Sequence, residues 1–233
     1  MKRTQIVLLA TAACVCLSSS VAAQMGMDFF KKPNIADIFR PVVGNGAVYE
    51  QQKNTPNAPK TDLEMSVVGK ELVDGQEGYW MEIGHMDSRS GQMGYGKVLV
   101  TKDDFRFHKV IFQQPGQPAM EMAFGGTGYG ERTRSHMQEE FDKWHSVGKE
   151  TITVPAGTYN CVHWKKDTGV GDVWFNDKIS PMGMVKSVNS GDTMVLVRVI
   201  TDAKDHITGP VTKFDPELMK KQMMEKMQKQ QNP

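Results

Sequence analysis

A cysteine and a histidine stand two residues apart in the segment ETITVPAGTYNCVHWKKD, residues 150–167. A thiolate beside an imidazole serves as a nucleophile in many enzymes and as a metal-binding pair in other proteins. Because strand side chains alternate between two faces, Cys161, His163 and Tyr159 would share one face. No basic cluster or helix start stands nearby to lower the pKa of the thiol, and no third residue is placed to orient the imidazole. We therefore expect a packed cysteine, and we assign no catalytic residue and no metal ligand.

A second group of titratable side chains lies close together in the sequence: Glu139, Glu140, Asp142 and His145. Such a group could serve acid–base catalysis or bind a metal. However, Ser135 and Gln138 match a capping box, which would begin a helix here. Met137, Phe141 and Trp144 then recur at the spacing of one buried helical face. We expect the titratable side chains to form the solvated face of that helix.

Methionine is abundant, with 17 residues in a chain of 233. Met-x-Met pairs occur at 25/27, 120/122 and 182/184, and two methionines directly follow histidines, in His85-Met86 and His136-Met137. Thioether and imidazole groups suit Cu(I), so a copper-binding exported protein is one alternative function. Methionine is also an adaptable core residue, and the pairs are scattered along the chain. We assign no cofactor.

The N-terminus has the layout of a secretory signal peptide. Lys2 and Arg3 precede an apolar run at 6–17, and small residues then lead to Ala23. The run is shorter than the roughly 20 residues of a membrane-spanning helix. Residues 1–23 are therefore predicted to be a cleaved signal peptide, and the mature chain a periplasmic protein. Cys14 is poorly placed for lipid attachment, so we expect no lipid anchor.

Composition narrows the class of protein further. Cleavage would leave Cys161 as the one cysteine, so the fold must depend on a hydrophobic core and not on disulfides. The remaining length fits a single domain. Lys and Arg number 28 against 27 Asp and Glu, for a net charge of +1. This balance lacks the basic excess of a nucleic-acid-binding protein, and we expect no nucleic-acid partner.

Short alternating segments separated by turn residues predict a mainly β fold. We expect a single curved antiparallel sheet over 61–213, with turns at Asp74-Gly75, Asp103-Asp104 and Pro155-Ala156-Gly157. Residues 24–60 are predicted to form a helix and linker segment, in which Asn34 caps a short helix. A capping helix would follow the glycine-rich segment near 126–130. Residues 214–233 have the pattern of an amphipathic helix.

The segment Val154-Pro-Ala-Gly-Thr-Tyr159 resembles a hairpin found in exported bacterial proteins of unknown function. In those proteins a tryptophan-bearing strand and a Pro-x-Gly-x-Val-Lys segment follow, as they do here at 172–175 and 181–186. The resemblance covers about residues 150–200. These proteins look like relatives of the outer-membrane lipoprotein carrier and receptor, whose fold is a curved antiparallel half-barrel with helices across its open face. The resemblance implies a scaffold that binds a lipid or another apolar ligand, and no catalytic residue.

These observations together predict a non-catalytic envelope protein that binds an apolar ligand, such as a lipid or lipoprotein acyl chain, or an envelope partner. The predicted helix at 214–233 would suit a peripheral membrane contact. The copper-binding protein above and a structural envelope protein without a small ligand are the alternatives. The sequence leaves open the ligand-binding residues, the oligomeric state and whether the concave face is open.

Overall fold

The computed structural model describes residues 34–86, 91–113, 116–123 and 128–213. The predicted signal peptide and the predicted helix at 214–233 lie outside these residues. The protein is mainly β, as predicted, with little helix. Its elements in chain order are α2 (Ile35–Ile38), β1 (Gly46–Lys53), β2 (Lys60–Val73), β3 (Gln76–Met86), β4 (Met93–Thr101), β5 (Phe107–Gln113), β6 (Ala119–Ala123), α3 (Tyr129–Phe141), β7 (Trp144–Val154), β8 (Gly157–Lys166), β9 (Gly171–Phe175), β10 (Met184–Asn189), β11 (Asp192–Ile200) and β12 (Val211–Lys213).

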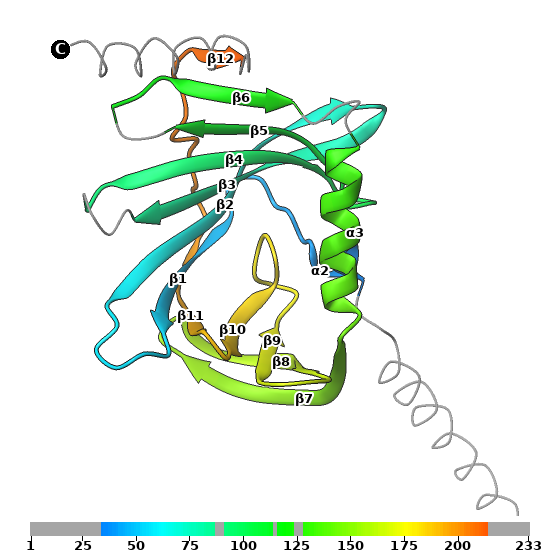
Figure 1. The fold of residues 1–233 in the computed structure, drawn as a ribbon, viewed down its shortest axis with the longest axis vertical. Helices are drawn as coiled ribbons and strands as arrows, with labels where there is room; N and C mark the ends of the chain where they lie inside the picture. Colours follow the sequence, from blue (N-terminus) through cyan, green and yellow to red (C-terminus); the bar gives the residue numbers. More distant parts are fainter. Residues whose placement is uncertain (1–33, 87–90, 114–115, 124–127, 214–233) are drawn as a thin grey trace, which may run out of the picture.

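These strands form one open, curved sheet, which is consistent with the predicted half-barrel (Figure 1). Their order is β12-β6-β5-β4-β3-β2-β1-β11-β10-β9-β8-β7. Neighbours are antiparallel except β12, which runs parallel to β6. The sheet begins at Gly46, earlier than the predicted boundary at residue 61. The second half of β1 is polar, so the sequence shows no clear sign of a strand there. In the structure β1 pairs with both β2 and β11 and joins the two halves of the sheet.

The predicted hairpin turns are present. Asp74 and Gly75 both have positive φ, 52° and 79°, as a type I′ turn between β2 and β3 requires. The β4–β5 hairpin turns at 102–106, and the β7–β8 hairpin turns at Pro155-Ala156. Gly157 opens β8 with a φ of 137°, a conformation that side-chain-bearing residues rarely adopt.

The two described helices differ in how well the sequence predicted them. Asn34 caps α2 as expected, because its side chain accepts a hydrogen bond from the Ala36 amide. The predicted capping box is wrong, since α3 begins at Tyr129 and places Ser135 inside the helix. The Gln138 side chain instead accepts a hydrogen bond from the Ile35 amide at 3.1 Å, and so links α3 to α2. The helix ends at Phe141, and Trp144 belongs to β7.

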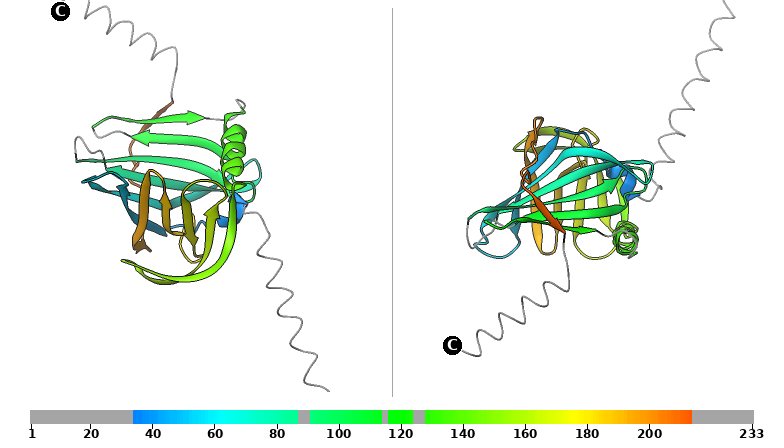
Figure 2. Two further views of the ribbon diagram at one scale, coloured as in Figure 1. Left: turned by 60° about the horizontal axis from the view of Figure 1, so that its bottom comes forward. Right: turned by 90° about the horizontal axis from the view of Figure 1, so that it is seen from above.

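Helix α3 spans the open side of the curved sheet, from the β5 region down to the start of β7 (Figures 1 and 2). Beneath it lies an apolar cluster, here called the helix-side cluster, to which α3 contributes Met137 and Phe141. Its buried members are Ile35, Phe39, Val67, Tyr79, Met81, Val98, Val100 and Phe105. Phe39 lies at its centre, with its ring edge-to-face against Tyr79 and Phe105.

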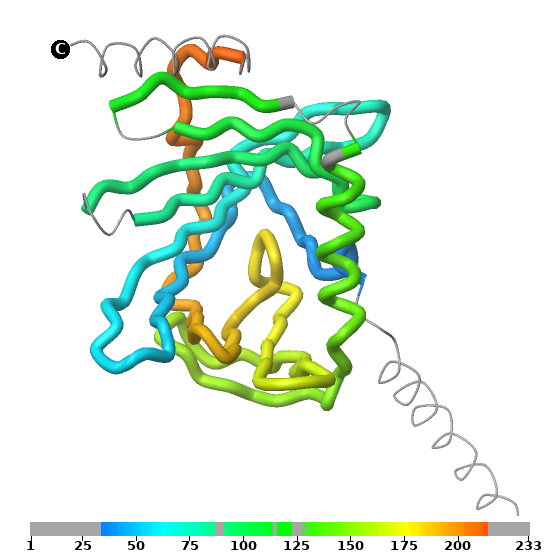
Figure 3. Tube along the Cα trace, viewed as in Figure 1, coloured from blue at the N-terminus to red at the C-terminus, as the bar shows by residue number. Residues whose placement is uncertain are grey.

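The segment between β9 and β10 folds into the space enclosed by the sheet and α3, as the chain trace in Figure 3 shows. Met182 of this segment packs against the helix-side cluster. Ile179 belongs to a second cluster, here called the hairpin-side cluster, whose other buried members are Ala47, Tyr49, Val154, Cys161, Val185 and Leu196. The Pro181 carbonyl accepts a hydrogen bond from the Arg40 amide at 2.7 Å. The protein's own chain therefore occupies part of the concave side.

The other face of β3, β4 and β5 is crossed by residues 201–210, here called the strap, before the chain joins the sheet edge as β12. Trp80 alternates with Tyr79 and Met81 along β3, so it points away from the helix-side cluster. It packs with Tyr95 against a small outer cluster that includes Ile207 of the strap.

Candidate functional site

Cys161 is a packed core residue. Its side chain is only 1% exposed within the hairpin-side cluster, and its thiol donates to the Tyr159 carbonyl at 3.7 Å. Burial, with a smaller contribution from the Glu150 carboxylate, raises the pKa of the thiol to about 11. The thiol therefore stays protonated near neutral pH, where a nucleophile or a metal ligand must be a thiolate.

His163 shares a strand face with Cys161 but directs both ring nitrogens to carboxylates. Its Nε2 lies 2.8 Å from Asp172 Oδ1, and its Nδ1 lies 3.2 Å from Glu150 Oε2. The ring stacks on Trp174 at 4.4 Å between centroids. With both nitrogens directed to these acids, His163 has none left to act as a base toward the thiol. The two residues are therefore a packed thiol, as expected, and a histidine held between two carboxylates.

The structure assembles a polar cluster around this histidine that sequence reasoning missed. Trp174 donates its indole N–H to Glu150 Oε2 at 2.8 Å, and the Lys186 ammonium lies 5.1 Å from the Trp174 ring centroid. These residues come from β7, β9 and β10, and only the strand register brings them together. The nitrogens of His163 and Trp174 are thus directed to the Glu150 and Asp172 carboxylates within the cluster.

Metal binding receives no support from the described residues. Within 34–86, 91–113, 116–123 and 128–213, no group of three or more His, Cys, Asp or Glu side chains could hold a metal ion. The pair Met182 and Met184 is divided between the helix-side and hairpin-side clusters. Met137 packs inward, while the adjacent His136 side chain is 83% exposed. Met25 and Met27 lie outside the described residues.

The titratable side chains predicted for one helical face are divided, since Glu139 and Glu140 lie on α3 and Asp142 at its end, whereas His145 belongs to β7. They make contacts at the surface. His145 Nδ1 lies 2.6 Å from Asp167 Oδ1, with both side chains about half exposed. Glu140 pairs with Lys143 and, at 3.6 Å, with Lys166. These contacts come from neighbouring turns and strands, and they form no enclosed site.

A threonine, a histidine and an aspartate also meet at the β4–β5 end of the sheet. Thr101 Oγ1 lies 3.3 Å from His108 Nε2, and His108 Nδ1 lies 3.8 Å from Asp74 Oδ2. The order resembles that of a nucleophile, a base and an orienting acid. However, Thr101 is only 1% exposed and its hydroxyl donates to Asp104, so no substrate reaches it. This group stabilises the β4–β5 turn.

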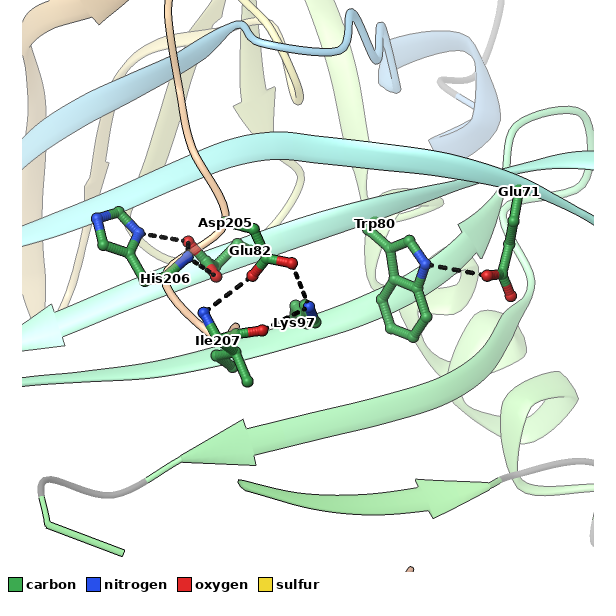
Figure 4. Close-up of polar contacts among 7 residues, drawn as sticks. All are labelled: Glu71, Trp80, Glu82, Lys97, Asp205, His206 and Ile207. Carbon is green, nitrogen blue, oxygen red and sulfur yellow. Dashed lines mark hydrogen bonds and ion pairs between the residues drawn. The ribbon is translucent and has the colours of Figure 1, made fainter. Parts of the chain in front are cut away.

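The outer face holds the most deeply buried charges described (Figure 4). Glu82 is 1% exposed and accepts hydrogen bonds from His206, from the backbone amide at 3.1 Å and from Nδ1 at 2.7 Å. Lys97 is 8% exposed, and its ammonium contacts Asp205 at 2.5 Å and the Ile207 carbonyl at 3.2 Å. Burial raises the pKa of Glu82, although the contacts with His206 act in the opposite direction. These pairs anchor the strap to the sheet.

The concave side under α3 is apolar. Its two apolar clusters contain an unusual share of methionine: Met81, Met137 and Met182 in one, and Met65, Met184 and Met194 in the other. Methionine is flexible and polarizable, and it suits surfaces that must adapt to differently shaped apolar partners. The sequence showed the abundance of methionine but not that these residues gather on this side.

No described helix has both the length and the apolar character needed to cross a membrane. No family model matches the sequence, and no curated protein matches it. Among solved structures, the chain is similar to a candidate lipoprotein of Parabacteroides distasonis, with 13% identity over 70% of this chain and 97% of that one, at a TM-score of 0.37. It is also similar to a candidate exported protein with a YmcC-like fold from Bacteroides fragilis, with 13% identity over 70% and 98% of the two chains, at a TM-score of 0.38. Both TM-scores are low, so the fold class here rests on the sheet itself.

Proposed function

We propose that this protein is an exported, non-catalytic binding protein of the cell envelope, and that it holds an apolar ligand such as a lipid acyl chain on the concave side of its sheet. The observation that carries the proposal is the position of α3 across the open side of the curve. Between sheet and helix lie the apolar side chains of the helix-side cluster, which would line the site once the helix moves, and apolar linings of this kind are common in ligand-binding sites.

The contacts of α3 support its role as a removable cover. The helix seals the helix-side cluster with the side chains of Met137 and Phe141, both only partly buried. The Gln138 side chain adds a hydrogen bond to α2. Arg134 Nε also donates to the Asp104 carbonyl at 2.5 Å, and Gly130 lies against the Phe107 backbone, so these contacts would have to break for the helix to admit a chain-like ligand.

The test is lipid analysis of the protein purified from its native envelope. We expect a lipid to co-purify and to appear in mass spectra of the organic extract, and we expect the delipidated protein to bind a hydrophobic dye. Absence of both a lipid and dye binding would overturn the proposal. Crosslinking that captures one stoichiometric protein partner, in place of a lipid, would favour a structural envelope protein instead.

A further inference from the structure

One face of strands β7, β8 and β9 carries large apolar side chains at successive positions. Residues directly opposite each other in antiparallel strands lie on the same face. The register pairs Trp164 with Val173 and Val162 with Phe175, and it pairs Trp144 with Lys166, two residues from Trp164. The β7–β9 face is defined here by Trp144, Val162, Trp164, Val173 and Phe175. It is opposite to the face of Cys161 and His163, and the register continues it through Ser187 of β10 to Met194 of β11, which packs in the hairpin-side cluster.

This face is incompletely covered by the described chain. Val173 is buried, but the other four side chains are only partly buried. None of the five belongs to any of the three apolar clusters formed by the described residues. At one end Phe175 lies beside Gly183, which is close to the Ile38 carbonyl, so the face adjoins the β9–β10 segment and α2. A contiguous, partly exposed apolar surface of this kind usually marks a binding site.

The charges on the β7–β9 face have one sign. Lys149 is paired with Val162, and Lys166 is paired with Trp144, so both lysines share the face. No acidic side chain occupies a position of this face within β7, β8 or β9. The Lys166 ammonium lies 5.9 Å from the Trp144 ring centroid and 3.6 Å from Glu140, which comes from α3. The strands therefore present aromatic surface flanked by ammonium groups.

We propose that the β7–β9 face binds the acyl chain of an anionic amphiphile, and that Lys149 and Lys166 attract its headgroup. The proposal rests on the proposed function and deepens it, because it names the class of ligand and the residues that contact it. Aromatic rings supply a large apolar contact area for the chain. Ammonium groups attract a carboxylate or phosphate, and they would discriminate against an uncharged analogue of the same chain.

The experiment uses dibromostearate, whose bromines quench indole fluorescence on contact, and its uncharged methyl ester. We expect the acid to quench the protein and to bind about tenfold more tightly than the ester, since each accessible ammonium contributes up to about fivefold in affinity. Trp144→Phe/Trp164→Phe should lose the quenching, and Trp80→Phe on the outer face should retain it. Lys149→Gln/Lys166→Gln should bind acid and ester equally. Lys165→Gln is the matched control, because Lys165 lies on the opposite face beside Asp172.

The outcomes separate the two proposals. Equal affinity for acid and ester in the unmodified protein, or full quenching in Trp144→Phe/Trp164→Phe, would overturn the inference while dye binding upheld the proposed function. If the unmodified protein neither binds the hydrophobic dye nor shows any quenching, both the inference and the proposed function would be overturned. Should the double tryptophan variant not fold, Val162→Glu tests the same face, because a carboxylate there should weaken binding of the acid at least tenfold. Unchanged binding in a folded Val162→Glu protein would also refute the inference.

Discussion

The stability of the fold should depend on His206, because this residue donates hydrogen bonds to the buried carboxylate of Glu82. We predict that His206→Phe destabilises the protein, because Phe keeps a ring to stack on Tyr95 but has no nitrogen to donate to Glu82. In the structure the His206 ring stacks on Tyr95 at 4.1 Å between centroids, and Nδ1 lies 2.7 Å from Glu82 Oε1. The substitution therefore removes the hydrogen bond and leaves most of the apolar contact.

The expected cost follows from the burial of Glu82. A hydrogen bond to a charged group contributes about 1.5–3 kcal/mol. The His206 backbone amide still donates to the carboxylate in the variant, so we expect a loss of about 2 kcal/mol in the free energy of unfolding at pH 7. Because burial raises the pKa of Glu82, the stabilising contribution of its neutral form is present at low pH and is lost as pH rises through that pKa. Removing the imidazole donor raises the pKa further. The cost of His206→Phe should therefore shrink on acidification.

The assay is urea unfolding followed by circular dichroism, in a double-mutant cycle with Glu82→Gln. Glutamine retains an acceptor but no charge, so the two substitutions should not be additive, and the coupling free energy should be about 1–2 kcal/mol. Lys165→Gln serves as a surface control with a change below about 0.5 kcal/mol. A cost of His206→Phe under about 0.5 kcal/mol, or strict additivity with Glu82→Gln, would refute the role assigned to this pair.

Three further predictions concern the core and the β7–β8 hairpin. Cys161→Ser should lower the free energy of unfolding by about 1–2 kcal/mol, because it buries a hydroxyl, and it should not impair ligand binding. In the unmodified protein the thiol should react with Ellman's reagent at pH 8 only after unfolding, because its pKa is raised to about 11. Fast reaction in the folded protein would contradict this. Phe39→Ala should cost about 3–5 kcal/mol in urea unfolding, because the ring is fully buried and its removal leaves a cavity. A cost below about 1 kcal/mol would show that the helix-side cluster does not depend on this ring. Gly157→Ala should lower the free energy of unfolding by about 1–3 kcal/mol, because the backbone at Gly157 has a φ of 137°. Gly209→Ala is the control and should cost little, since no atom lies within 4 Å of the added methyl group. Equal effects of the two substitutions would contradict the strain argument.

Local patterns predicted the β hairpins well because their causes are local. Asp74 and Gly75 tolerate positive φ, and that preference depends on the residues themselves. Side-chain alternation has a local cause too, and along β3 it directs Tyr79 and Met81 to the helix-side cluster and Trp80 to the outer cluster. By contrast, the capping box at Ser135 was wrong, because a short motif has the same appearance at the start of a helix and inside one. The longer helix was decided by packing of α3 over the sheet.

The candidate binding surface could be predicted only in part. The hairpin and tryptophan-bearing strands near Cys161 drew attention to residues 150–186, and four of the five residues that define the β7–β9 face lie in that region, Trp144 being the exception. Which residues share a face there depends on a register irregularity between Ser146 and Gly148, which no local pattern indicates. The contacts of His163 with Glu150 and Asp172 depend on the same register. Sequence reasoning therefore found the strands and the packed Cys161, but it could not assign the other side chains to faces.

The sequence by itself determined the elements of this protein: a mainly β chain with turns at Asp74-Gly75 and Pro155-Gly157, a capped α2, and no charge excess that would favour nucleic acid. Only the tertiary structure decided which cluster surrounds Cys161, that Glu82 is buried under the strap, and that α3 crosses the concave side. Turn and strand preferences arise from interactions between neighbours in the chain. Burial and strand partnership arise from residues far apart in sequence, whose contacts exist only once the whole sheet has formed.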